Sequence, residues 1–458
     1  MTRRVRAALA AVVLLAPACA LKTPPDAAAI RSEGMSKVAI PERFHAPGSA
    51  PTGILEANWV AGFQDDQLTA AIIEAIRNNP DLVVAAERVQ QAILRANLAG
   101  AKLYPSVDVL ARGGTKLSGD NSGMQGVLLT ASWELDLWGR VRYGRAAATA
   151  DAEAIRADFE FARQSMAAVV ARNWMLAIEA GLQAEIARAT IREGDELIRL
   201  AETRARVGVG NSEDIFIARA TVGSYRDALR EIELAREQAV RGLELLLGRY
   251  PAAAAAVTPT LPRQPDPVPA GLPSALLERR PDVIAAERRV AAAFNRVGEA
   301  KAARLPAIAL TSGVSAISSD LFVLKDHSNP VWNLGANLVA PLFQGGALKT
   351  QVEIRTAEQR QAVAAYASVG LRAFGDVESA LAAEGAARDR EAILAETLAD
   401  YQRAFEIVQT QFRVGSTDLR FVTQRQLTLN ATNAALLRVR VEQRVQRVNL
   451  YLALGGGY

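Results

Sequence analysis

The sequence predicts a mixed α and β fold that is built twice from the same parts. Each half of the 458-residue chain holds two short stretches with alternating apolar residues, set between long, alanine-rich helical stretches. In the first half a helical stretch opens at Asn79-Pro80-Asp81 and ends before Pro105. In the second half one opens at Arg280-Pro281-Asp282 and ends before Pro306. The matching prolines at the start and end of the two helical stretches, about 200 residues apart, indicate an internal duplication and a pseudo-symmetric protomer.

The N-terminus is predicted to be a signal peptide over residues 1–18. Arg3, Arg4 and Arg6 precede a short apolar run, and Cys19 follows it. Two interpretations stay open, because Ala16 stands where a lipoprotein signal usually has leucine: lipid attachment (palmitate) at Cys19, or ordinary cleavage after residues 16–18. We expect Cys19 to carry the lipid, and residues 19–60, rich in Pro, Ala and Ser, to form a lipid anchor and extended tether.

The first structural repeat is predicted over residues 61–250. It begins with a helix and continues with a β-hairpin over 105–138, whose second strand alternates strictly from Val127 to Leu137. A long helix over 140–206, without internal proline, and a return helix over 212–247 complete it. At 1.5 Å per residue the long helix would span roughly 100 Å, so it must run beside other helices as a coiled bundle.

The second repeat, over residues 274–454, is predicted to follow a proline-rich connector over 251–273. It begins with a helix, as the first repeat does. A hairpin over 306–343, a long helix over 346–413 and a return helix over 417–454 follow in the same order. Residues 455–458 form a short tail. Because no flexible linker separates the repeats cleanly, we expect one elongated unit rather than independent domains.

The hairpins have one apolar and one polar face. A soluble sandwich would explain such alternation, but two isolated hairpins cannot form a stable sheet alone. No later stretch has the ~18 uninterrupted apolar residues of a membrane helix, so any membrane crossing must use strands. We therefore predict strands that face lipid on the apolar side, with a polar lumen lined by Glu134, Asp136, Asn333 and Asn337.

The composition favours close helix packing and argues against several function classes. Half of the residues are hydrophobic, 5% are aromatic, and the formal net charge is +4. The arginines are scattered along helices without interleaved aromatic residues, so nucleic-acid binding is not expected. With His45 and His327 as the only histidines and a single cysteine, we expect no metal site, no cofactor and no enzyme.

Four motifs in order make the chain resemble the bacterial outer-membrane efflux protein family, the TolC-like channels, and within it the lipoprotein branch of NodT and OprM type. The most specific is GLPSALLERRPDV at 271–283, with AERR at 286–289. Supporting motifs are ELDLWGR at 134–140, PLFQGG at 341–346 and NLYLALGGG at 449–457. The resemblance covers nearly the whole chain after the tether.

The resemblance implies a homotrimer that forms a twelve-stranded β-barrel in the outer membrane and a periplasmic α-barrel. It also implies the partners of a tripartite efflux pump, namely a periplasmic adaptor (membrane fusion) protein and an inner-membrane transporter of resistance-nodulation-division type. Drugs or other small solutes would pass through the channel without catalysis. Most of the mass would lie in the periplasm.

In this family the periplasmic tip docks the adaptor and constricts the pore. The resemblance therefore assigns adaptor docking to the glycine turns at Val207, Gly208, Val414 and Gly415, and the gate to Arg413, Asp418, Arg420 and Gln424. Gln424 stands where family members often carry aspartate. The alternative for each glycine is a simple helix C-cap.

Two other functions stay open. The exit duct of a type I protein secretion system uses the same fold. A structural periplasmic coiled-coil lipoprotein would need the helices but not lipid-facing strands, and it would tolerate arginine at Leu129 or Leu334.

Overall fold

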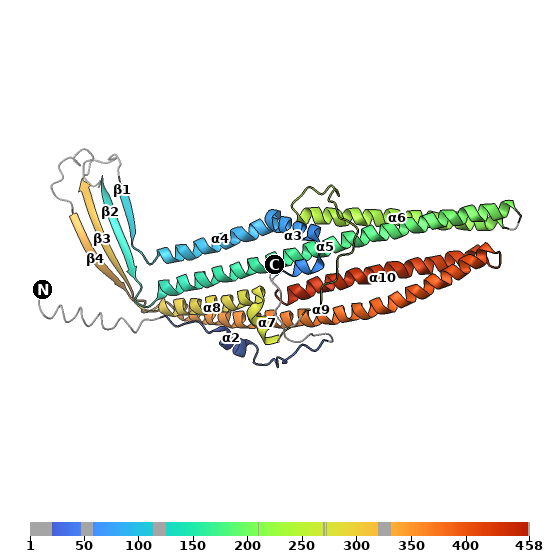
Figure 1. Ribbon diagram of the computed structural model, residues 1–458. Coiled ribbons are helices and arrows are strands. Elements are labelled where there is room, and N and C mark those ends of the chain that lie inside the picture. The colour runs from blue at the N-terminus through green and yellow to red at the C-terminus, as the bar shows by residue number, and fades with distance from the viewer. Residues whose placement is uncertain are drawn as a thin grey trace. The chain divides into compact units, whose positions relative to one another are not determined.

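The computed structural model describes residues 21–46, 58–112, 125–208, 210–268, 271, 273–318 and 331–456. They form helices and one sheet (Figure 1). The chain divides into two compact units. Unit 1 contains the described parts of residues 1–39, 87–158 and 284–369, and unit 2 those of residues 40–86, 159–283 and 370–458. Each unit takes segments from both sequence repeats, because the long helices α5 (Arg140–Arg206) and α9 (Ala347–Arg413) contribute to both units.

The helices of the two repeats match closely in length. α4 (Pro80–Ala101) and α8 (Pro281–Ala302) each have 22 residues. α5 (Arg140–Arg206) and α9 (Ala347–Arg413) each have 67, and α6 (Ser212–Leu246) and α10 (Leu419–Ala453) each have 35. Proline opens α4 and α8 at a position where no backbone N–H is needed. In the long helices and in the return helices, each residue of the second repeat is numbered 207 higher than its equivalent in the first repeat.

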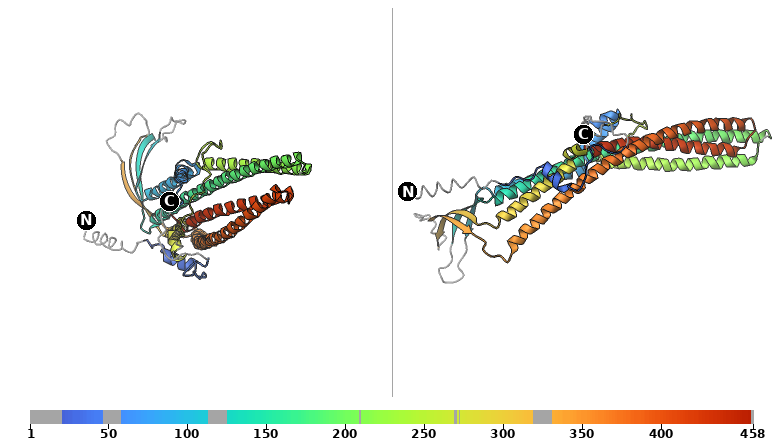
Figure 2. Two further views of the ribbon diagram at one scale, coloured as in Figure 1. Left: turned by 45° about the vertical axis from the view of Figure 1, so that its right-hand side comes forward. Right: turned by 90° about the horizontal axis from the view of Figure 1, so that it is seen from below.

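Each long helix and its return helix form an antiparallel pair within unit 2. Ion pairs join α5 to α6, including Arg188–Glu233 and Arg226–Asp195, and Arg390–Glu442 joins α9 to α10. All views in Figures 1 and 2 show the two pairs as hairpins. Most of these ion pairs are exposed and contribute little stability, so the buried apolar stripes hold the helices together.

One antiparallel sheet contains four strands in the order β1-β2-β3-β4, confirming the predicted mixed fold. The strands are β1 (Ser106–Arg112), β2 (Gln125–Leu135), β3 (Ala307–Ser318) and β4 (Val331–Val339). β2 pairs with β3, which joins the hairpins of the two repeats into one sheet. Among the described residues, β1 and β4 pair on one side only and are the sheet's edges.

The helix ends of the two repeats are held by equivalent contacts in unit 2. Asn79 donates from its side-chain amide to the carbonyl oxygen of Leu246 (2.9 Å), and Arg280 donates to the carbonyl oxygen of Ala453 (3.3 Å). Leu246 and Ala453 are the last residues of α6 and α10. Both donors are buried. The residue before the helix-opening proline therefore anchors the end of the return helix in each repeat.

The segment predicted as an extended tether is not extended throughout. Residues Ala27–Gly34 form α2, with Asp26 as N-cap, and Ile30 and Met35 are buried. A short 3₁₀ helix, η2, follows at Trp59–Phe63 and buries both aromatic rings. Burial against the helices of the body stabilises these short elements, which is a tertiary effect that local composition does not reveal.

Several features differ from or lie outside the predictions. α7 (Pro273–Arg279) forms a separate short helix before α8. Cys19, His327 and the hairpin loops over 113–124 and 319–330 lie outside the described residues. Among the described residues, no helix combines the length and apolar character needed to cross a membrane.

Candidate functional site

The junction between β2 and α5 is built from the two predicted lumen carboxylates in unit 1. Asp136 accepts hydrogen bonds from the backbone N–H groups of Val141 (2.9 Å) and Arg142 (2.8 Å), and so caps α5. Glu134 pairs with the guanidinium of Arg140, at 3.0 and 2.5 Å. The Asp136 contacts satisfy N–H groups that have no partner inside the helix, and the negative charge of Asp136 interacts favourably with the helix dipole. Both carboxylates therefore have a structural task at this junction.

The polar face of the sheet carries the other two predicted lumen residues, Asn333 and Asn337 on β4. The register places Asn337 opposite Ala309 on β3, which in turn is opposite Glu134 on β2. Asn333 lies over Gly313, where an added Cβ would meet its side-chain oxygen at 2.9 Å. Glu134, Asn333 and Asn337 thus share one face, whereas Asp136 lies beyond the last residue of β2.

The opposite face of the sheet is apolar and uncovered. Leu334 on β4 is 85% exposed, Trp332 is 73% exposed and Val109 on β1 is 66% exposed. The register aligns Leu129 with Val314 and then with Trp332, so these side chains lie on the same face of three strands. A continuous exposed apolar face of this kind marks a surface for lipid or for another protein.

The turns that join each long helix to its return helix expose apolar side chains. In the first turn Val207 is 65% exposed beside Gly208, and in the second Val414 is 74% exposed beside Gly415. The φ angles are +74° at Gly208 and +85° at Gly415. That conformation is the left-handed helix cap that glycine adopts at low cost. The glycines thus act as helix caps, which is the simple alternative, and leave the valines exposed.

The predicted gate residues lie on the second turn and the start of α10. Arg413, Asp418, Arg420 and Gln424 are exposed. Asp418 stands at the N-cap of α10 without a side-chain capping bond, whereas Asn211 caps α6 by accepting from the N–H of Glu213 at 2.9 Å. Burial, together with the like charge of Asp418, raises the pKa of Asp214, while Arg204 and Arg420 oppose this shift. The charge of Asp418 on the second turn therefore acts on Asp214 next to the first turn.

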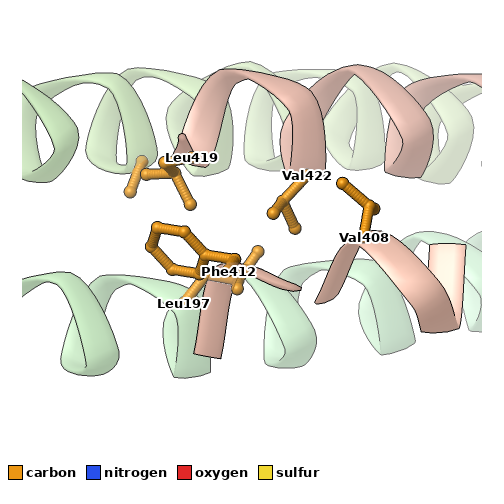
Figure 3. Packing of buried hydrophobic residues seen from close by; sticks show 6 residues of the cluster. Leu197, Val408, Phe412, Leu419 and Val422 are labelled. Carbon is orange, nitrogen blue, oxygen red and sulfur yellow. The ribbon is translucent and has the colours of Figure 1, made fainter. Parts of the chain in front are cut away.

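A buried core below the turns joins the two helix hairpins. Leu197, Ala218, Val408, Phe412, Leu419 and Val422 form it, from α5, α6, α9 and α10. Figure 3 shows Leu419 and Val422 directed toward Val408, Phe412 and Leu197. Arg204 donates to the carbonyl oxygen of Phe412, and its guanidinium lies 4.6 Å from the Phe412 ring centroid. These contacts tie the end of α5 to the end of α9.

The structure brings the predicted tip residues of the second turn close to residues that the sequence did not single out. Arg204, Phe412 and Asp214 are the missed contributors, and their partners lie about 200 residues away along the chain. Among the described residues, no group of three or more His, Cys, Asp or Glu side chains could hold a metal ion. The arrangement therefore provides surfaces and charges along helices and strands, and its carboxylates are used as caps and ion pairs.

Comparison with known proteins agrees with these features. The family described as outer membrane efflux protein matches residues 71–249 and 272–456. The cation efflux system protein CusC of Escherichia coli O6:H1 is 32% identical over 418 residues, 88% of each chain. The pyoverdine export outer membrane protein OpmQ of Pseudomonas putida is 31% identical over 461 residues, 96% of this chain and 95% of the relative.

Solved structures of outer-membrane channels have the same fold. A crystal structure of CusC has a TM-score of 0.82 and 29% identity, covering 91% of this chain and 97% of that one. The open state of the Neisseria gonorrhoeae MtrE outer membrane channel has a TM-score of 0.80 and 25% identity, covering 96% and 97%. None of these names is that of an enzyme. The chain belongs to the outer membrane efflux protein family.

Proposed function

We propose that the protein is the outer-membrane exit duct of a tripartite efflux pump and conducts drugs or other small solutes passively. The observation that carries this proposal is a four-stranded sheet with an uncovered apolar face, a polar opposite face and two edges that are unpaired among the described residues. A single compact protein would bury such a face. A strand segment of a membrane channel would expose it to lipid.

Closure of the sheet requires other copies of the chain. Unpaired strand edges are not tolerated in lipid, because their N–H and C=O groups find no water there. Four strands are too few to surround a lumen, so we propose a homotrimer whose three sheets join into a twelve-stranded barrel. The helices of three protomers would form the periplasmic tube below it.

The tip of the helices is proposed to dock the adaptor and to gate the duct. The exposed Val207 and Val414 beside Gly208 and Gly415 would contact the adaptor protein. Arg413, Asp418, Arg420 and Gln424 would constrict the pore, since all four are exposed and Asp418 is free of a capping bond. The inner-membrane partner is proposed to be a transporter of resistance-nodulation-division type.

The anchor is proposed to be a lipid on Cys19. The first described residues of the chain, Leu21 and Lys22, lie against α5, where the backbone N–H of Lys22 donates to the Tyr143 hydroxyl at 2.9 Å. α5 begins shortly after the end of β2, so this contact places Lys22 near the strands. A lipid at Cys19 would therefore reach the inner leaflet of the outer membrane beside the barrel.

Arginine substitutions on the two faces of β4 test the proposal. Leu334→Arg places a charge on the apolar face, and we expect it to cost about 2–4 kcal/mol near the bilayer midplane and to prevent assembly of the trimer. The matched control is Asn333→Arg, one residue away on the polar face, which should assemble. Trimers extracted from outer membranes are counted by native mass measurement. Normal assembly of both variants would contradict lipid-facing strands and support the coiled-coil lipoprotein instead.

A further inference from the structure

A cavity of about 660 Å³ in unit 1 carries an unusual concentration of arginine. It lies between α4, α5, α8 and α9, and four arginines from three of these helices line it: Arg95, Arg289, Arg296 and Arg355. Two carboxylates, Asp151 and Glu358, also line it, and most of the remaining wall is alanine. Small apolar side chains leave room for a solute, while the guanidinium groups provide directed hydrogen-bond donors.

The positive charge of the cavity is only partly neutralised. Arg296 pairs with Asp151, and Arg355 pairs with Glu358 at 2.8 Å. Arg289 pairs with Asp158, which is not among the lining residues. Among the described residues, no carboxylate lies within ion-pair distance of Arg95. The lining therefore has two more guanidinium groups than carboxylates, and one of its arginines has no charged partner.

On α5 the cavity lies on the side of the helix opposite the side that contacts the N-terminal segment. Leu21 and Lys22 line a separate cavity together with Arg142, Arg145 and Thr149 of α5. The arginine-rich cavity uses Ala148, Asp151 and Ala154 of the same helix instead. Since a lipid on Cys19 must lie outside the tube, the N-terminal segment marks the outer face. The arginine-rich cavity then faces the lumen, a step that rests on the proposed function.

We propose that this cavity is an anion-binding site on the wall of the duct, which takes passing solutes that carry carboxylate or phosphate groups. The planar guanidinium group binds both kinds of oxyanion in a bidentate manner. The alanine wall would accept the organic part of such a solute. A trimer would present three copies around one lumen, so that weak individual sites would together raise the local concentration of anionic solutes.

The test uses single-channel recording of the full-length trimer in planar bilayers. Citrate and pyrophosphate are added separately as the carboxylate and phosphate probes, and the reduction in channel conductance is titrated. The variant is Arg95→Gln combined with Arg355→Gln. The matched control is Arg360→Gln, because position 360 lies about 140° around α9 from position 355 at 3.6 residues per turn.

We expect both probes to reduce the conductance of the parent channel in a saturable manner. The double variant should raise the half-saturating concentration at least tenfold, and the control should leave it unchanged. A conducting channel whose block is absent, or equal in parent and double variant, would overturn the anion site and leave the duct intact. Block by only one probe would narrow the site to that oxyanion. A trimer that conducts no ions would contradict the duct itself.

Discussion

The two repeats have equivalent backbones, yet one buried pair of positions differs completely between them. In the first repeat Ala177 on α5 and Val240 on α6 are buried apolar residues. The positions 207 residues later are Glu384 on α9 and Arg447 on α10, which form a buried ion pair. The guanidinium of Arg447 also donates to the carbonyl oxygens of Pro265 (2.8 Å) and Asp266 in the connector.

The difference follows from an extra task in the second repeat. The connector between the repeats packs against α10, and its backbone carbonyl groups need donors there. An apolar pair such as Ala177 and Val240 would leave them unsatisfied. The duplication thus preserved the helix geometry, and side-chain chemistry diverged where one copy must hold an additional segment.

The largest expected effect comes from breaking the buried ion pair. Glu384→Ala leaves the charge of Arg447 buried without its carboxylate, and we expect the free energy of unfolding to fall by about 3–5 kcal/mol. Glu384→Ala combined with Arg447→Met removes the unpaired charge and leaves only the carbonyl groups of Pro265 and Asp266 without their donor, a smaller penalty, so it should cost less than the single change. Chemical denaturation in detergent measures both. A double variant that is less stable than Glu384→Ala would contradict this view of the pair.

The caps of the return helices offer a second contrast. Gly248 and Gly455 have φ angles of +73° and +69°, so alanine at either should cost about 1–2 kcal/mol. A Cβ at Gly248 would also lie 2.7 Å from the carbonyl oxygen of Asn78, whereas at Gly455 the nearest atom is 3.2 Å away. Gly248→Ala should therefore destabilise more. Gly208→Ala, with no atom within 4 Å, reports the backbone cost alone, and equal losses at all three sites would rule out the steric contribution.

Substitutions at the two turns of the tip should distinguish a residue that stabilises the fold from a residue that gates the channel. Asn211→Ala removes the cap of α6 and should cost about 1 kcal/mol of stability without changing conductance. Asp418→Ala removes no capping bond and should raise single-channel conductance, as should Gln424→Ala. The change at Asp418 also removes a like charge and should lower the pKa of Asp214 toward its ordinary value. Unchanged conductance in both α10 variants would exclude these two residues from the gate.

The smallest effect concerns pH. Glu244 on α6 is buried, which opposes its ionisation, but it accepts hydrogen bonds from the N–H groups of Ala253, Ala254 and Ala255, and its pKa is lowered. A lowered carboxyl pKa gives stability that is present above the unfolded-state pKa and is lost as the pH falls through the folded-state pKa.

Hydrogen exchange, corrected for intrinsic rates, should therefore show protection at the backbone N–H groups of residues 253–255. This protection should decline as the pH falls below about 4.3, the ordinary pKa of glutamate. The equivalent position in the second repeat is Tyr451, which stacks on Trp59 with ring centroids 5.5 Å apart and has no carboxyl group. Protection at Trp59 should not change over this pH range. Parallel losses at the two places would indicate general acid unfolding instead.

The regular elements could be predicted because their signals are local. Strict alternation from Val127 to Leu137 indicated β2, and the absence of proline between Arg140 and Arg206 indicated one continuous helix. The helix-opening prolines Pro80 and Pro281 fixed the starts of α4 and α8. The eight residues of α2 gave a weaker signal, because their local cue is the N-cap Asp26 alone and so short a helix also needs the burial of Ile30.

The contacts of the candidate site could not be predicted in the same way. Arg204 and Phe412 are 208 residues apart, and periodicity identifies buried faces without identifying their partners. Alternation placed Glu134 and Asp136 on a polar strand face. In the structure Glu134 pairs with Arg140, and Asp136 accepts from the first N–H groups of α5, because the chain turns sharply at Gly139. Contacts between residues that are far apart in the sequence form only in the folded chain, so a local sequence pattern does not reveal them.

The most direct test of the proposed duct is the native mass of the protein extracted from outer membranes, measured together with its single-channel conductance. We predict a species of about three times the mature mass that conducts ions in planar bilayers. A water-soluble species that conducts no ions would contradict the membrane duct and favour a structural coiled-coil lipoprotein.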